Sequence, residues 1–228
     1  MSKTHTIITI GRQFGSGGRE IGKRLADELG IEFYDKELLS RAAKDSKICK
    51  ELFETHDEKP TNSFLYSLVM DTYSMGFASG SVNEMPLNHK IFLAQFDAIK
   101  KIVSDDNLFN YQAKVIRQLA EEESCVIIGR CADYALEERD DVLSVFIHAD
   151  LEDRIKNVAK LNELTDNKAK DLIHKTDKRR ASYYNYYTNK KWGDAESYDI
   201  CINSSKFGVD GCVKAIKDFL ELKASLEE

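Results

Sequence analysis

The chain has 228 residues, of which 42% are hydrophobic, and a formal net charge of −6. This length allows one sizeable α/β domain with an insert or lid, and the acidic balance argues against a general nucleic-acid binder. No apolar run approaches the ~20 residues of a membrane span, and five cysteines without a C-x-x-C pair indicate neither a disulfide framework nor a metal site, so we expect a cytoplasmic protein.

The N-terminal part alternates between strand and helix signals. Residues 6–10 are a short β-branched run, which is typical of a buried strand. Apolar residues then recur every four positions over 21–29, which predicts an amphipathic helix that ends at Gly30. Residues 31–34 are predicted to form a second strand, followed by a helix from about residue 36.

The middle of the chain is predicted to be largely helical. Apolar residues keep helical spacing through much of 46–123, and a Gly/Ser-rich stretch over 74–86 is expected to loop out. Strand signals return at 125–128 and 142–147, both rich in Val and Ile.

The C-terminal part adds helices and one more strand. Residues 150–153 resemble a capped helix start, and 166–191 form a strongly charged helical stretch. A last strand is expected at 198–202 and a closing helix at 209–222. Five short apolar strands separated by helices predict an α/β fold in which helices cover both faces of a parallel sheet.

The most specific motif is GRQFGSGGRE at residues 11–20, between the first strand and the first helix. Glycines in this position let backbone N–H groups turn inward around an anion, and the start of the helix adds a positive field. Ligands of open parallel sheets bind at the carboxyl ends of the strands, where this loop falls. The sequence therefore predicts a phosphate-binding loop.

The loop departs from the usual pattern G-x-x-x-x-G-K-[ST]. With Gly18 as the glycine before the lysine, Arg19 takes the lysine position and Glu20 a Ser/Thr position. Arg19 still offers several donors to phosphate, but the usual hydroxyl ligand of Mg²⁺ is missing. Glu20 is read either as a metal ligand through water or, preferably, as an acidic residue suited to the first turn. Lys23 completes a literal match but is expected to lie on the solvated face of the helix.

Several stretches together resemble one family. They are GRQFGSGGREIGKRLADELGIEFYD, VIIGRCADYAL, VFIHADLEDRI and DKRRASYY. With these motifs the chain resembles the cytidylate kinase-like family, from about residue 7 to 204 and least over 46–120. The family is similar to cytidylate kinases and, more distantly, to shikimate and adenylate kinases.

The resemblance implies a three-layer α/β/α P-loop kinase fold with a five-stranded parallel sheet, a helical acceptor-binding insert and a helical lid. The whole chain, 1–228, would then be one kinase domain. Its core would comprise about 1–45 and 124–228, its insert about 46–123 and its lid about 165–192.

The same resemblance implies roles for individual residues. Arg19, Asp35, Arg130 and Arg180 would be catalytic, and ATP with Mg²⁺ the cofactor. Asp35 matches an aspartate near the transferring phosphate, and Arg41 an arginine that holds the acceptor's phosphate. Departures are Lys36 and Glu37, where the family has serine and glycine, and Cys131, where it has aspartate. The cofactor would be bound by Gly15, Ser16, Gly17, Gly18, Arg19 and Glu20, and the acceptor by Asp35, Arg41, Arg130, Asp177 and Arg180.

Elementary chemistry supports part of this assignment from the residues themselves. Arg130 and Asp35 each follow an apolar strand at its carboxyl end, a favoured position for active-site residues. Phosphoryl transfer depends on positioning and on neutralising charge, for which the bidentate guanidinium of arginine is well suited. Arg41 and Arg154 are equally well explained as ordinary surface residues of helices.

The stretch 166–191 holds eight Lys/Arg against three Asp and carries a cluster of tyrosines. We expect a lid that closes over ATP and supplies Arg179 or Arg180. The alternatives are a solvated helix whose tyrosines pack on the core or on a partner subunit, and single-stranded nucleic-acid binding, which is the least favoured.

Three functions follow. The first is an ATP-dependent kinase of a small acceptor, with a nucleoside monophosphate as the leading candidate. The second, motivated by the missing lysine and Ser/Thr, is a nucleotide-binding sensor without turnover. The third is a kinase of a non-nucleotide metabolite. The Gly/Ser loop near residues 76–81 is either a mobile flap or a homodimer contact, and we expect no membrane or nucleic-acid partner.

Overall fold

A computed structural model of the chain describes residues 5–35 and 105–226. The chain divides into two compact units, Met1–Asp35 with Ile116–Glu228, and Lys36–Val115. The first unit holds the sheet and the glycine-rich loop. The helical signals between 46 and 104, the Gly/Ser loop at 74–86 and Arg41 lie outside the described residues, and the division into core, insert and lid stays a prediction.

The first unit contains a five-stranded sheet, which confirms the strands predicted from the sequence. All neighbouring strands pair in parallel, in the order β2-β3-β1-β4-β5. The strands are β1 (Ile7–Arg12), β2 (Glu32–Tyr34), β3 (Cys125–Ile128), β4 (Val142–His148) and β5 (Ile200–Asn203). The described helices are α1 (Gly18–Leu29), α6 (Asp105–Glu122), α7 (Ala132–Ala135), α8 (Leu151–Asn162), α9 (Asp166–Thr188) and α10 (Ser204–Leu226), with a 3-10 turn at Ala195–Ser197.

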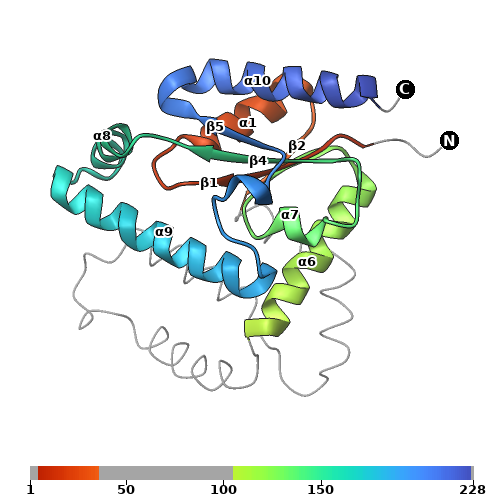
Figure 1. Ribbon diagram of the computed structural model, residues 1–228, viewed down its shortest axis with the longest axis horizontal. Helices are drawn as coiled ribbons and strands as arrows, with labels where there is room; N and C mark the ends of the chain where they lie inside the picture. The colour runs from red at the N-terminus through yellow and green to blue at the C-terminus, as the bar shows by residue number, and fades with distance from the viewer. Residues whose placement is uncertain (1–4, 36–104, 227–228) are drawn as a thin grey trace, which may run out of the picture. The chain divides into compact units, whose positions relative to one another are not determined.

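Helices cover both faces of this sheet, as Figure 1 shows. Helices α1 and α10 lie together on one face, and α7 and α9 lie on the other side. Because both faces are covered, the central strands are apolar along almost their whole length. The predicted three-layer α/β/α arrangement is therefore confirmed.

The core between the sheet and helices α1 and α10 explains the periodicity of the sequence. Ile8 and Ile10 alternate to this face of β1, and Ile21 and Leu25 meet them from α1 with no exposed surface. Helix α1 ends at Gly30, whose left-handed backbone lets its N–H reach the carbonyls of the last turn. Its predicted end is thus confirmed.

Among the predicted boundaries that differ from the structure are those of the first strand and of the closing helix. The first strand extends to Arg12, two residues beyond the apolar run, because β4 pairs with it as far as Arg12 opposite Ile147. The closing helix begins at Ser204, and Gly208 interrupts it with a non-helical backbone. Within the described residues, no helix has both the length and the apolar character that a membrane span requires.

Candidate functional site

A glycine-rich loop joins β1 to α1 at the carboxyl edge of the sheet. Its backbone is left-handed at Gly15 (φ 83°) and Gly17 (φ 75°), a conformation that glycine adopts at little cost. Gly17 is the N-cap of α1, and the helix begins at Gly18. The N–H groups of the first turn and the positive end of the helix dipole therefore open toward the loop, which suits an anion such as phosphate.

The Ser16 hydroxyl is directed into the protein. Ser16 is only 3% exposed, and its Oγ lies 2.9 Å from the carbonyl oxygen of Gln13 and 3.2 Å from that of Ile147. The hydroxyl of Ser204 donates to the Ser16 carbonyl oxygen at 2.7 Å. The side chain of Ser16 thus fixes the shape of the loop. If Ser16 contacts a cofactor, it does so through its backbone.

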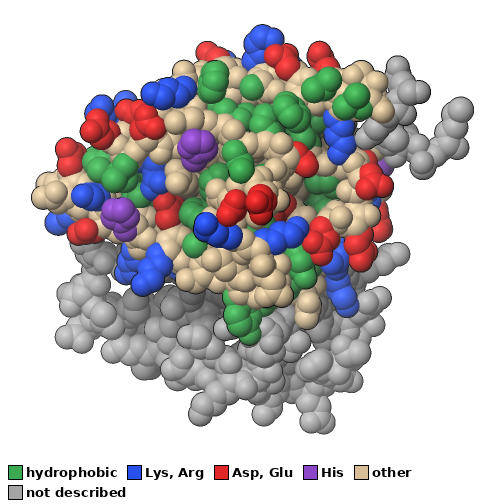
Figure 2. Space-filling model, in the orientation of Figure 1, with side chains coloured by type: hydrophobic (Ala, Val, Ile, Leu, Met, Phe, Trp, Pro, Cys, Tyr) green, Lys and Arg blue, Asp and Glu red, His purple; other side chains and the backbone are tan. Residues whose placement is uncertain are grey.

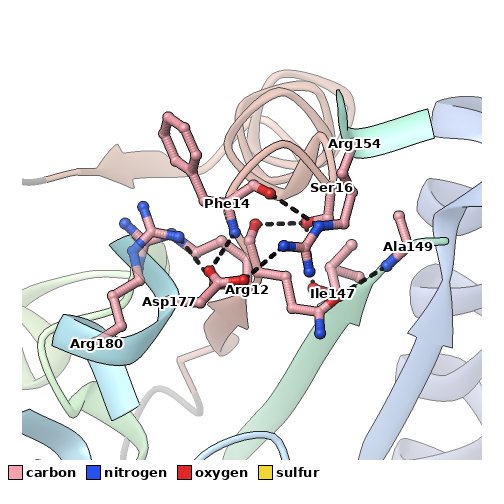
Figure 3. A network of polar contacts seen from close by, with 9 residues as sticks. Arg12, Phe14, Ser16, Ile147, Ala149, Arg154, Asp177 and Arg180 are labelled. Carbon is pink, nitrogen blue, oxygen red and sulfur yellow. Dashed lines mark hydrogen bonds and ion pairs between the residues drawn. The ribbon is translucent and has the colours of Figure 1, made fainter. Parts of the chain in front are cut away.

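Helices α8 and α9 hold the loop from outside, as Figure 3 shows. One carboxylate oxygen of Asp177 accepts the backbone N–H of Phe14 at 2.8 Å, and the other accepts from the guanidinium of Arg154 at 2.6 Å. Arg154 also donates to the carbonyl oxygen of Phe14 at 3.1 Å. Because Arg154 is buried, the reading of this residue as a surface side chain is wrong.

Arg180 reaches the same segment one turn further along α9. Its guanidinium donates to the carbonyl oxygen of Arg12 at 3.0 Å and lies 5.5 Å from the centre of the Phe14 ring. From α8, the side-chain amide of Asn157 donates to the carbonyl oxygen of Gly15 at 3.0 Å. The predicted lid helix is therefore tied to the backbone of the loop by Asp177 and Arg180; the acceptor contacts predicted for these two residues stay a prediction.

This clamp of Asp177, Arg154 and Arg180 is desolvated. Burial raises the pKa of Asp177, against the opposing effects of the Phe14 N–H and the charge of Arg154. Burial likewise lowers the pKa of Arg154, and it lowers the pKa of Arg180 to about 10. Burial thus opposes the charged form of all three groups, and the neighbouring opposite charges act against it.

Arg19 and Asp35, both predicted site residues, are brought together. The Arg19 guanidinium donates twice to one carboxylate oxygen of Asp35, through Nε at 2.9 Å and a terminal nitrogen at 2.5 Å. The Asp35 side chain is 8% exposed, whereas that of Arg19 is 67% exposed. The pair links the first turn of α1 to the end of β2. Glu20, beside it, is exposed, as expected of a residue in the first turn.

The end of β3 has an unusual backbone. Gly129, Arg130 and Cys131 are all left-handed, with φ of 70°, 63° and 54°. For the two residues that are not glycine this conformation costs roughly 1–2 kcal/mol each. Such strain is characteristic of functional sites, and here it places Arg130 at the carboxyl edge, between the strand and α7.

The structure adds one residue to this edge that was missed in the sequence. Arg12, the last residue of β1, has a guanidinium that reaches Gly129. Burial lowers the pKa of Arg12 well below its usual value, and the charges of Arg180 and Arg130 lower it further, while Asp35 and Asp177 act in the opposite sense. The signal was the position of Arg12 at the start of the glycine-rich motif, but the predicted strand stopped at residue 10, short of it.

The aromatic cluster of α9 is partly structural. Tyr184 is buried, and its hydroxyl donates to the carboxylate of Asp133 at 2.6 Å. Trp192 packs edge-on against Phe146. Tyr186, by contrast, is largely exposed.

On the face seen in Figure 2, basic and acidic side chains are interspersed over the described residues, so this face has no continuous basic patch for nucleic acid.

Comparison with known proteins gives the family. Residues 7–206 match the sequence profile of the cytidylate kinase-like family, so the chain belongs to that family. Among solved structures, an uncharacterized protein from Eubacterium ventriosum ATCC 27560 is 29% identical with a TM-score of 0.66, over 95% of this chain and 99% of that one. No significant match was found among curated proteins.

Kinases also share the fold. A gluconokinase from Sinorhizobium meliloti 1021 is 13% identical with a TM-score of 0.50, over 100% of both chains. A shikimate kinase from Bacteroides thetaiotaomicron is 14% identical with a TM-score of 0.49, over 95% of this chain and 98% of that one. The likeness to the gluconokinase, together with the parallel sheet, confirms the predicted α/β kinase fold. The family match makes the chain kinase-like.

Proposed function

We propose that this member of the cytidylate kinase-like family transfers the γ-phosphoryl group of ATP to a small acceptor, with a nucleoside monophosphate as the leading candidate. One observation carries the proposal. Beside a loop whose N–H groups suit an anion, four arginines gather at the carboxyl edge of the sheet, two from strand ends and two from helices. They are Arg12, Arg19, Arg130 and Arg180, accompanied by the carboxylates of Asp35 and Asp177.

This arrangement suits phosphoryl transfer. In the reaction, an oxygen of the acceptor attacks the γ-phosphorus in line while the bond to the β–γ bridging oxygen breaks, and ADP leaves. The protein contributes positioning and charge rather than covalent chemistry. The backbone of Gly15 to Arg19 would hold the donor, and Asp35 would position the acceptor or the metal. Arg130 and Arg180 would bind the acceptor and neutralise the transferring group.

The described residues fit Mg²⁺ only as an ion that arrives with ATP. They contain no group of three or more His, Cys, Asp or Glu that could hold a metal. Mg²⁺ in kinases commonly keeps several waters and uses one or two carboxylates besides the phosphates. Asp35, at the end of β2, is the carboxylate that would face it. When bound, the ion neutralises phosphate charge.

The experiment is ADP formation from Mg-ATP by the purified chain, with CMP, dCMP, UMP, AMP, GMP and shikimate tested in parallel. Rapid turnover with CMP or UMP would support a nucleoside monophosphate as the acceptor. Turnover with shikimate alone would move the proposal to a non-nucleotide metabolite. If the chain does not bind ATP at all, as measured by calorimetry, the proposed function is wrong.

A sensor without turnover is the second candidate. It is favoured by the absence of lysine at positions 18 and 19 and by the inward-facing hydroxyl of Ser16. It predicts micromolar or tighter ATP binding with no ADP formed against any acceptor. For either function we expect the chain to act in the cytoplasm, where ATP is supplied, and a homodimer remains one prediction for its assembly.

A further inference from the structure

The start of α1 defines a second register for the phosphate loop. In G-x-x-x-x-G-K, the lysine follows the last glycine directly and opens the helix, where it reaches the β- and γ-phosphates. Here the last left-handed glycine is Gly17, and α1 begins at Gly18. When the motif is aligned on the first residue of α1, Gly18 takes the position of the lysine and Arg12 that of the first glycine. The cation and the glycine of the usual pattern have therefore exchanged places.

The contacts of Arg12 show that the exchange is also spatial. A Cβ atom added to Gly18 would lie 2.6 Å from the Cβ and 3.1 Å from the Cγ of Arg12. A Cβ atom added to Gly129 would lie 2.1 Å from a terminal nitrogen of the same guanidinium. Atoms cannot pack this closely, so both glycines leave room for Arg12. Its stem fills the space over Gly18, and its guanidinium ends over Gly129.

The neighbouring arginines have partners that Arg12 lacks. Arg19 forms an ion pair with Asp35, and Arg154 forms one with Asp177. Within residues 5–35 and 105–226, no hydrogen bond or ion pair joins the guanidinium of Arg12 to another group. The contact between Arg12 and Arg180 is made by the backbone carbonyl oxygen of Arg12, which accepts a hydrogen bond from Arg180. The charges of Asp35 and Asp177 act on the Arg12 guanidinium, but each of these carboxylates is bonded to another arginine. A phosphate group would supply an anion bonded to Arg12 itself.

We propose that Arg12, from the end of β1, provides the cation that binds the β- and γ-phosphates of ATP, in place of the lysine of the usual loop. This inference rests on the proposed function. The side chain runs from the donor loop at Gly18 to the strand end at Gly129, so it faces the phosphoryl group that passes between donor and acceptor. Arg19, whose guanidinium is engaged by Asp35, then acts as a positioning residue that holds the end of β2.

The first test compares Arg12→Gln, Arg19→Gln and Lys23→Gln with the unaltered chain, each checked for folding by circular dichroism. Arg12→Gln should weaken Mg-ATP binding, measured by calorimetry without acceptor, about tenfold or more, since a hydrogen bond to a charged group is lost. Its kcat for ADP formation should fall about 100-fold. Lys23→Gln, on the exposed side of α1, is the matched control and should bind ATP like the unaltered chain.

Three outcomes would overturn the proposal. The first is an Arg12→Gln variant that binds ATP normally while Arg19→Gln does not, which would return the cation to Arg19. The second is an Arg12→Gln variant with unchanged ATP affinity but a raised acceptor KM, which would place Arg12 on the acceptor. The third is an unaltered chain that does not bind ATP, which would remove the proposed function together with this inference.

The exchange itself can be tested by reversing it. The double variant Arg12→Gly/Gly18→Lys restores the usual pattern and should bind ATP at least about tenfold more tightly than Arg12→Gly alone. Gly18→Ala should lower the melting temperature when Arg12 is present and lower it much less in the Arg12→Gly background. This second pair of variants reports on packing without ATP. Equal effects of Gly18→Ala in both backgrounds, or no gain from Gly18→Lys, would contradict the exchange.

Discussion

The clamp between Asp177 and the phosphate loop makes a quantitative prediction for Asp177→Asn. Asparagine has nearly the same shape and can still accept the N–H of Phe14 through its oxygen. It cannot neutralise Arg154, whose side chain is 7% exposed and has Asp177 as its ion-pair partner. The substitution therefore isolates the charge of Asp177 from its hydrogen bond to the loop.

The size of the effect follows from burial. Removing one partner of a buried ion pair costs about 3–5 kcal/mol, because the other charge remains unpaired. Burial raises the pKa of Asp177 and lowers that of Arg154, so desolvation already offsets part of the stabilisation that the ion pair provides. We therefore use the lower end of this energy range. In a chain of this size each kcal/mol shifts the melting temperature by about 2–4 °C, so we expect a fall of about 6–12 °C.

The assay is thermal unfolding of Asp177→Asn beside Asp171→Asn, an exposed aspartate on the same helix. The control should melt within about 2 °C of the unaltered chain, since exposed substitutions rarely exceed about 0.5 kcal/mol. If Asp177→Asn melts like the control and only raises the acceptor KM, the clamp is not structural. In that case the acceptor contact predicted from the sequence would be the role of Asp177.

Three further predictions concern other parts of the fold. Glu163 is the exposed, left-handed C-cap of α8, so Glu163→Gly should raise the free energy of unfolding by about 1 kcal/mol. Lys160→Gly, within the same helix, should lower it by about as much. If both variants are destabilised in urea unfolding, the backbone of Glu163 is not strained. Burial raises the pKa of Asp133, so its ionisation destabilises the fold as the pH rises above the ordinary aspartate value. Asp133→Asn, which keeps an acceptor for Tyr184, should therefore be more stable than the unaltered chain at about pH 7 and lose that advantage near pH 3; a gain that does not depend on pH would refute this reasoning. Burial raises the pKa of Cys125 and of Cys131 to about 12, so a thiol reagent at about pH 8 should leave both unmodified while it labels the exposed Cys201. The labelled sites are identified by mass spectrometry, with Cys201→Ser as control. Label on Cys125 or Cys131 would contradict this prediction.

The strands and the loop could be predicted because their signals are local. A β-branched run such as 7–10 and the four-residue spacing of Ile21 and Leu25 each report which face of one element is buried. The glycines of the loop are equally local, since positive φ at Gly15 and Gly17 depends on the turn itself. Parallel pairing then brings the ends of the strands to one edge, so the sequence alone was enough to place Asp35 and Arg130 there.

The rest depended on contacts between distant parts of the chain. The first strand extends to Arg12 because β4 pairs with it, and nothing in the run 6–10 reports that pairing. The bond between Asp177 and the N–H of Phe14 spans 163 residues, so no local pattern reveals it. The register of the loop, too, is set by where α1 begins, at Gly18, and a count of glycines in the sequence allows either Gly17 or Gly18 to precede the cation.

Under the proposed function, the charges at the carboxyl edge would let an acidic chain favour a small phosphate compound over nucleic acid. Asp35 and Asp177 lie at the back of the site, each engaged by one arginine, and they fix the end of β2 and the loop. Arg12, Arg130 and Arg180 lie near one another beside these pairs, and their charges add to a local positive field. Around this edge the net charge of −6 repels an extended polyanion, whereas a compact anion meets only the local field. Because the arginines are partly desolvated, their attraction for phosphate is greater than that of the same charges in water. The carboxylates thus fix the positions of the arginines bonded to them, which would add selectivity to the proposed site.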